Sequence, residues 1–80
     1  MPTVLRVGPY RFYFFSNEGD EPPHVHIDRD QATAKVWLET GELARSRGFR
    51  PKEINAILTH VGDHRSRLLE AWHEYFRTAD

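Results

Sequence analysis

Residues 10–27 read YRFYFFSNEGDEPPHVHI, and this stretch decides the fold. Five of its first six residues are aromatic, which favours a strand. Residues 16–23 then combine turn formers with three acidic residues and two consecutive prolines, which a central strand does not accept. Residues 24–28 alternate polar and apolar side chains, as a half-buried strand does. We therefore predict two strands joined by an exposed loop.

The flanking segments extend this pair of strands into a sheet. Residues 3–7 lie before a Gly-Pro turn, and residues 33–39 contain the strand formers Val36 and Trp37. Short turns between successive strands favour an antiparallel meander. The sequence thus predicts a four-stranded, mainly antiparallel sheet over residues 3–39.

The second half of the chain is typical of helix. Residues 42–47 predict a short helix that Gly48 ends. Residues 54–76 carry apolar side chains every three or four positions, so one long C-terminal helix should pack on one face of the sheet. Arg65 interrupts the apolar stripe, which predicts either a kink near Gly62 or an ion pair. The expected fold class is α+β.

The composition describes one small domain, residues 1–80. Eleven basic and twelve acidic residues leave a net charge of −1, without the overall basic excess of a protein that coats nucleic acid. The absence of cysteine excludes a disulfide framework, a thiolate zinc site and a cysteine nucleophile. The apolar runs near the N-terminus are too short for a membrane span or a signal peptide. We expect a cytoplasmic protein that does not contact membranes.

The far end of the long helix predicts a partner interface. A helix of this length exceeds a strand of about five or six residues, so its last turns should extend beyond the sheet. Those turns hold the large side chains of Leu68, Trp72, Tyr75 and Phe76. A partner chain, or a second copy in a homo-oligomer, would cover them. Alternatively, the helix bends at Gly62 and packs them on its own sheet.

The open face of the predicted sheet carries aromatic and basic side chains. Strand alternation places His24, His26, Lys35 and Trp37 on the face opposite the helix, with an aromatic residue of the second strand. Such a face can stack the bases of single-stranded RNA, or it can form the core of a protein interface. Both interpretations stay open at the level of sequence.

The histidine pair is the motif with the most chemistry. His24 and His26 share one face of a strand, and two imidazoles at this spacing can act as general acid and base on a phosphodiester. With Glu21 of the same EPPHVHI motif, they are the candidate catalytic residues. Two histidines are half of a zinc site, and the third ligand, which could be Glu18, Asp20 or Asp28, is not defined by the spacing, so we expect no metal and no other cofactor. Alternatively, both histidines hold the acidic loop on the sheet.

A cluster of cations precedes the C-terminal helix. Arg45, Arg47, Arg50 and Lys52 lie near a helix N-terminus, whose free N–H groups attract phosphate. With Trp37 of the sheet, they are the candidate nucleic-acid or phosphate-binding residues. Alternatively, they are solvated loop charges. The cations and the histidines form one site only if the fold brings them together.

The whole chain resembles one family of small bacterial proteins. The segments YRFYFFSNEGDEPPHVHI, AKVWL, ELARSRGF and LLEAWHEYF are similar to those of the domain of unknown function 4160 family. Its members are commonly encoded beside a small protein of another uncharacterised family, domain of unknown function 2442, in an arrangement like a toxin–antitoxin pair. The resemblance implies a toxin-like protein with a small antitoxin-like partner encoded nearby.

Two functions from different classes follow. In the first, which we favour, the chain is the toxin of a type II-like pair and acts on RNA or translation, as a metal-independent ribonuclease with His24 and His26 as acid and base. In the second, it is a non-catalytic binding or regulatory module whose aromatic sheet face and C-terminal helix bind a partner. A metal-dependent nuclease that uses Glu18 or Asp20 with the histidines is a third option.

Overall fold

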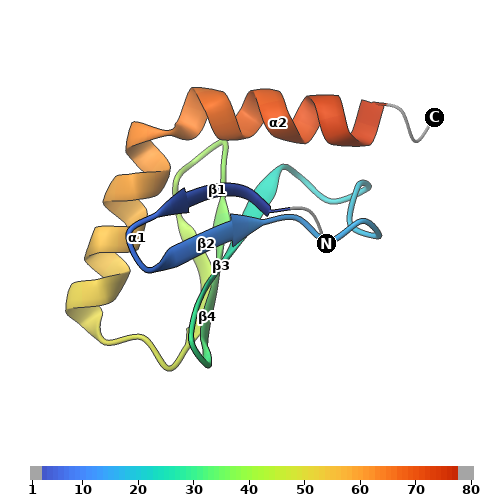
Figure 1. Ribbon diagram of the computed structural model, residues 1–80. Helices are drawn as coiled ribbons and strands as arrows, with labels where there is room; N and C mark the ends of the chain where they lie inside the picture. The colour runs from blue at the N-terminus through green and yellow to red at the C-terminus, as the bar shows by residue number, and fades with distance from the viewer. Residues whose placement is uncertain (1–2, 78–80) are drawn as a thin grey trace.

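A five-stranded antiparallel sheet and two helices make up the computed structural model, which describes residues 3–77 (Figure 1). The strands lie in chain order and are β1 (Thr3–Val7), β2 (Tyr10–Tyr13), β3 (His24–Arg29), β4 (Ala32–Trp37) and β5 (Leu43–Arg47). The helices are α1 (Pro51–Asp63) and α2 (Arg65–Arg77), and neither is long and apolar enough to cross a membrane. The predicted α+β class and the antiparallel meander are thus confirmed.

The segment at residues 42–47, predicted as a short helix, is instead the fifth strand. Leu43–Arg47 pairs antiparallel with β4. Gly41 takes a φ of +76°, which a tight turn requires, and the N–H of Trp37 donates to the carbonyl of Glu42 at 2.9 Å. The helix prediction was wrong because the free edge of β4 offers backbone hydrogen bonds that outweigh a weak local helix preference.

The single long helix predicted for the C-terminal half is interrupted. His64 leaves the helical conformation, with φ −111° and ψ 15°, and the chain turns sharply between α1 and α2 (Figure 1). Arg65 secures this junction, because its Nε donates to the carbonyl of Leu38 at 2.7 Å and its Nη2 donates to the carbonyl of Glu39. A break close to Gly62 is thus present. The guanidinium of Arg65 donates its hydrogen bonds to backbone carbonyls instead of forming an ion pair with a carboxylate.

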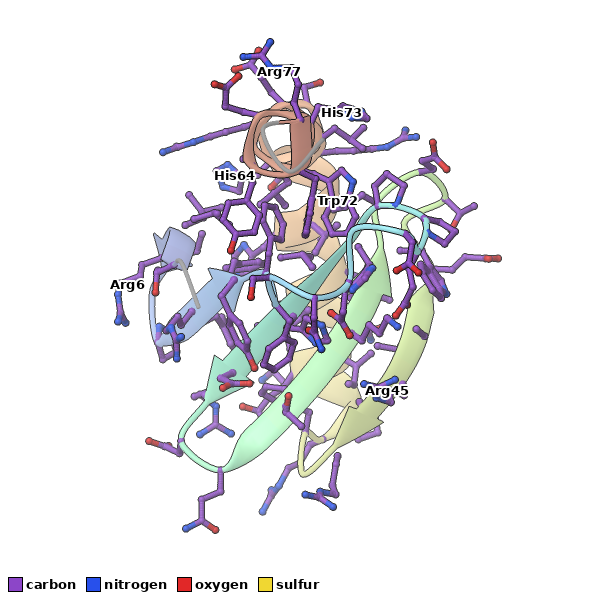
Figure 2. All side chains as sticks on the ribbon, turned by 90° about the vertical axis from the view of Figure 1, so that its right-hand side faces the viewer. Arg6, Arg45, His64, Trp72, His73 and Arg77 are labelled. Atoms are coloured by element: carbon purple, nitrogen blue, oxygen red, sulfur yellow. The ribbon has the colours of Figure 1, made fainter. Side chains whose placement is uncertain are left out.

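The two helices cover different parts of the sheet. α1 lies behind the sheet in Figure 2, and α2 lies over the end of the sheet. Apolar side chains of the strands and of α1 form one fully buried core; among them are Val25, Ile27, Val36, Ile57 and Val61. Burying one such side chain contributes about 1.5–3 kcal/mol. α1 therefore seals one face of the sheet and leaves the opposite face to the loop between β2 and β3.

The bend lets α2 pack on the chain's own sheet. Leu68 and Trp72 are buried, and Tyr75 and Phe76 are half-buried. The ring of Phe14, directly after β2, lies 5.3 Å from that of Trp72 and 6.0 and 6.2 Å from those of Tyr75 and Phe76. The four residues expected at a partner interface are therefore largely covered from within, as in the alternative that the sequence left open.

Candidate functional site

One row of side chains crosses four strands on the face opposite α1. In the sheet register His26 pairs with Tyr13 on one side and with Lys35 on the other. Lys35 in turn pairs with Arg45. Directly paired residues of neighbouring strands share a face and lie about 5 Å apart. This cross-strand row, Tyr13–His26–Lys35–Arg45, thus sets a phenol, an imidazole and two cations side by side.

The cross-strand row lines a pocket of about 450 Å³. Arg45, labelled on β5 in Figure 2, is exposed at this face, and so is Arg47, whereas Lys35 and His26 are buried. The complete lining consists of Tyr13, Phe15, His26, Thr33, Ala34, Lys35, Arg45, Ser46 and Arg47. A concave surface with several cations and two aromatic rings suits a phosphate-bearing ligand.

The structure unites part of the predicted site and separates the rest. His26, Arg45 and Arg47 meet in the pocket, although they come from β3 and β5. Arg50 and Lys52 do not line it, because they lie beside and within the first turn of α1, which packs on the other face of the sheet. The four cations predicted to bind phosphate together are thus divided. Only Arg45 and Arg47 lie on the face of the sheet that carries the histidines.

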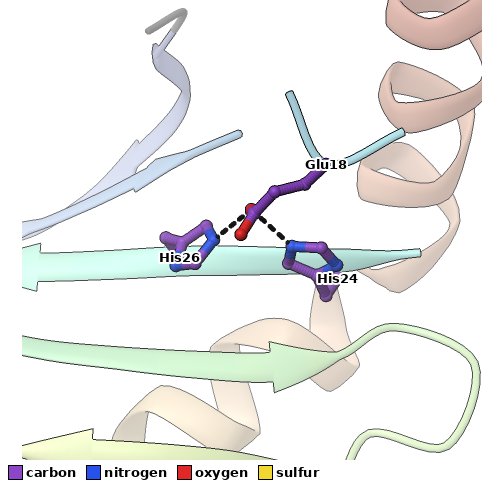
Figure 3. Close-up of side chains that lie close together, drawn as sticks. All are labelled: Glu18, His24 and His26. Atoms are coloured by element: carbon purple, nitrogen blue, oxygen red, sulfur yellow. Dashed lines mark hydrogen bonds and ion pairs between the residues drawn. The ribbon is translucent and has the colours of Figure 1, made fainter. Parts of the chain in front are cut away.

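Glu18, from the loop between β2 and β3, contacts both histidines through one carboxylate oxygen (Figure 3). Its Oε1 lies 2.8 Å from Nε2 of His24 and 2.7 Å from Nε2 of His26. His24 is fully buried, with its ring 5.0 Å from that of Trp72, whereas His26 lines the pocket. Of the two histidines, only His26 is therefore placed to meet a ligand in the pocket.

The pKa values in this cluster favour an ionised Glu18 beside a neutral His26. Burial alone would raise the pKa of the Glu18 carboxyl, but the hydrogen bonds and charges of His24 and His26 together outweigh it and lower that pKa. Burial, together with the nearby charges of His24 and Lys35, lowers the pKa of His26 by more than the hydrogen bond and charge of Glu18 raise it. At neutral pH Glu18 is an acceptor, and His26 is predominantly uncharged.

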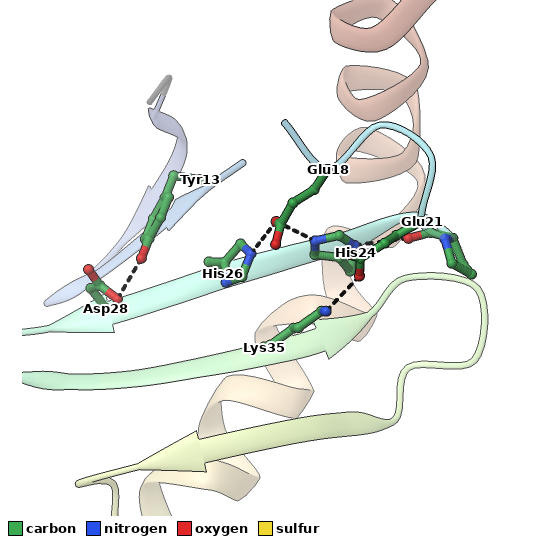
Figure 4. Close-up of polar contacts among 8 residues, drawn as sticks. Tyr13, Glu18, Glu21, His24, His26, Asp28 and Lys35 are labelled. Atoms are coloured by element: carbon green, nitrogen blue, oxygen red, sulfur yellow. Dashed lines mark hydrogen bonds and ion pairs between the residues drawn. The ribbon is translucent and has the colours of Figure 1, made fainter. Parts of the chain in front are cut away.

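Glu21 pairs with a lysine instead of the histidines (Figure 4). Its Oε1 accepts a hydrogen bond from Nζ of Lys35 at 2.8 Å, and the same Nζ lies 4.6 Å from the ring centroid of Trp37. The loop turns back on itself, since the N–H of Glu21 donates to the carbonyl of Glu18 at 3.2 Å. This turn brings Glu18 over the histidines and leaves Glu21 beside β4.

Tyr13 ends the cross-strand row with a fixed hydroxyl. That hydroxyl donates to Oδ1 of Asp28 at 3.0 Å, and burial together with this hydrogen bond raises the pKa of Tyr13 to about 12. The guanidinium of Arg11 lies 4.5 Å from the centroid of the Tyr13 ring. The phenol therefore stays protonated at neutral pH, and Tyr13 is the aromatic residue of β2 that shares the face of the histidines.

Thr33 and Ser46 are lining residues that sequence reasoning missed. Thr33 had a signal, because strand alternation places it on the same face as Lys35. Ser46 had none, because residues 42–47 were predicted as helix and a strand would place Ser46 on the face opposite Arg45 and Arg47.

The fold and the site define a class of protein. It is a small α+β domain whose open sheet face carries aromatic and basic side chains beside a buried cluster of two histidines and one glutamate. The model of the family described as domain of unknown function (DUF4160) matches residues 10–73, so the chain belongs to that family. The match spans every residue that lines the pocket and all three members of the histidine cluster. No curated protein and no solved structure matches the chain.

Proposed function

We propose that the chain binds single-stranded RNA over the cross-strand row and acts in the cytoplasm as the toxin of a toxin–antitoxin-like pair. The observation that supports this most strongly is the meeting of His26, Lys35, Arg45 and Arg47 in one pocket. Cations match the phosphates of RNA, and aromatic rings at the pocket can stack its bases. The family resemblance supports the second part of the proposal, a small antitoxin-like partner encoded nearby.

The charge on this face differs from that of the whole chain. The net charge is −1, yet among residues 3–77 no ion pair involves Arg45 or Arg47. Such a local excess of positive charge attracts phosphate. Because a pocket of about 450 Å³ admits one nucleotide rather than a duplex, we expect unpaired RNA as the ligand.

His26 is the member of the histidine pair that can reach bound RNA. It lines the pocket, while Glu18 holds its Nε2 at 2.7 Å and thereby fixes the ring. The two-histidine acid and base mechanism expected from the sequence needs both rings at the substrate. Since His24 does not line the pocket, we assign contact with RNA to His26 alone and give His24 and Glu18 the task of positioning it.

Growth and bulk RNA integrity in a bacterial host test this proposal. We expect the chain expressed alone to arrest growth and fragment RNA, and we expect the neighbouring gene to relieve both effects. His26→Gln should abolish them, whereas His73→Gln, at an exposed position on α2, is the matched control and should leave them unchanged. Normal growth with intact RNA from well-folded wild-type protein would contradict the proposal.

A non-catalytic binding module is the second candidate. It is favoured by the burial of His24 and His26 and by their hydrogen bonds to Glu18, as expected of residues that hold a loop on a sheet. In this case the chain would form a complex with the neighbouring protein without arresting growth when expressed alone. His26→Gln would then change only the stability of the fold.

A further inference from the structure

The Glu18–His24–His26 cluster brings three metal-ligating groups to one point. Both Nε2 atoms face the same carboxylate oxygen, and the three ligand atoms lie within 4.8 Å of one another (Figure 3). Both imidazoles come from β3, where residues two positions apart share a face. The sheet thus fixes two ligands, and the loop supplies the third.

The hydrogen bonds of His24 require a positive charge between its ring and Glu18. Nδ1 of His24 lies 2.9 Å from the carbonyl oxygen of Pro22, which only accepts hydrogen bonds, so this nitrogen carries a proton. In a neutral ring Nε2 then carries a lone pair, and it faces Oε1 of Glu18 at 2.8 Å, which is also an acceptor. A second ring proton or a metal ion reconciles the two contacts.

The hydrogen bond between His24 and the carbonyl of Pro22 is also typical of a metal-binding histidine. Histidines that bind metals usually donate their other ring N–H to a backbone carbonyl or a carboxylate, which fixes the tautomer and directs the free nitrogen at the ion. His24 has this arrangement, with Nδ1 on the carbonyl and Nε2 on the cluster. Within residues 3–77 no lysine or arginine is bonded to Glu18, because the nearby Lys35 pairs with Glu21.

We propose that Glu18, His24 and His26 bind one divalent transition-metal ion, with Zn²⁺ as the representative ion. Two imidazoles and one carboxylate are a donor set typical of zinc sites and of related sites for first-row metals, and three protein ligands leave a coordination position open. Ligands about 2.0–2.1 Å from a tetrahedral ion lie roughly 3.3 Å apart. The distances of 2.7 and 2.8 Å therefore need to open by about 0.5 Å.

Glu18 can make this adjustment while the histidines stay in place. It lies in the loop between β2 and β3, and 17% of its side chain is exposed, whereas both histidines are held in a central strand. The inference does not rest on RNA binding. It gives His26 a second role, as a metal ligand at the edge of the pocket, beside the contact with RNA that the proposed function assigns to it.

Titration of untagged, chelator-treated full-length protein with Zn²⁺ in a calorimeter tests the metal site. We expect one ion per chain in the wild type. Glu18→Gln should weaken binding at least roughly tenfold, because it replaces an anionic ligand by a neutral amide. Glu21→Gln is the matched control: it removes the same charge from the same loop and should bind zinc as the wild type does, since Glu21 contacts Lys35 instead.

Two results would overturn the metal site: no binding to the folded wild type, or equal binding by the wild type and Glu18→Gln, which would place zinc on surface histidines. Thermal melting of each variant shows whether it is folded. Should Glu18→Gln unfold, the visible spectrum of Co²⁺ bound to the wild type decides, because nitrogen and oxygen ligands in a four-coordinate site give intense bands and a hydrated ion does not. Arg45→Gln/Arg47→Gln separates the two proposals, since it should keep zinc binding and weaken RNA binding.

Discussion

Replacing Arg45 and Arg47 by glutamine should weaken the binding of single-stranded RNA about 15-fold at 0.15 M salt. Both arginines are exposed at the pocket, and within residues 3–77 neither has a carboxylate partner, so each can neutralise one phosphate. A phosphate contact on a single strand releases about 0.7 counterion, which at this salt is a factor of about 4. Two contacts multiply to about 15-fold, or about 1.6 kcal/mol.

The assay is the fluorescence anisotropy of a short labelled RNA over a range of about 50 to 200 mM salt. The slope of log affinity against log salt should fall in magnitude by about 1.4. Arg50→Gln/Lys52→Gln is the matched control, because it removes the same charge at the start of α1 and should leave both values unchanged. Equal losses in the two double variants would refute the assignment of RNA to the sheet face and leave only a diffuse charge effect.

Four further measurements follow from the structure. Glu21→Gln should tighten RNA binding up to about fourfold, because it releases Lys35 from its ion pair; weaker binding would show that Glu21 itself contacts RNA. Tyr13, whose folded pKa of about 12 exceeds the ordinary value of 10.0, contributes stability that is complete below pH 10 and is lost as the pH rises through about 12. The 295 nm absorbance of the folded chain should accordingly show one tyrosine that ionises late, and Tyr13→Phe should remove that step. Arg65→Met should lower the free energy of unfolding in urea by about 1–3 kcal/mol, because two backbone carbonyls lose their donor; an unchanged midpoint would mean that water replaces it. Gly48→Ala should cost about 1–2 kcal/mol in the same assay, since φ is +90° there and a Cβ would lie 3.1–3.2 Å from Ala32; a wild-type midpoint would show that this turn relaxes freely.

Local patterns were sufficient to predict the first four strands and their faces. Strand alternation correctly placed His24, His26, Lys35 and Trp37 on the face away from α1, because one-sided burial leaves the register little freedom. The fifth strand could not be predicted in this way. Residues 43–47 are a strand because β4 has an edge to pair, and the decisive partner lies about ten residues earlier in the chain.

The candidate site shows the same division between local and long-range information. The histidine pair was recognisable because two residues on one strand define their own geometry. The carboxylate partner of the histidines was not recognisable, because Glu18, Glu21 and other acids lie at similar distances along the loop. Glu18 contacts the histidines because of the way the loop turns back on itself. Likewise, Arg45 lies on the face of the histidines only because β5 pairs with β4.

The most direct test of RNA binding over the cross-strand row is an NMR titration of isotope-labelled chain with unlabelled single-stranded RNA. The largest shift changes should occur at the amides of Arg45 and Arg47 and at the ring of His26. The amides of α1 should move little. Changes confined to the first turn of α1, around Lys52, would contradict the proposed interface.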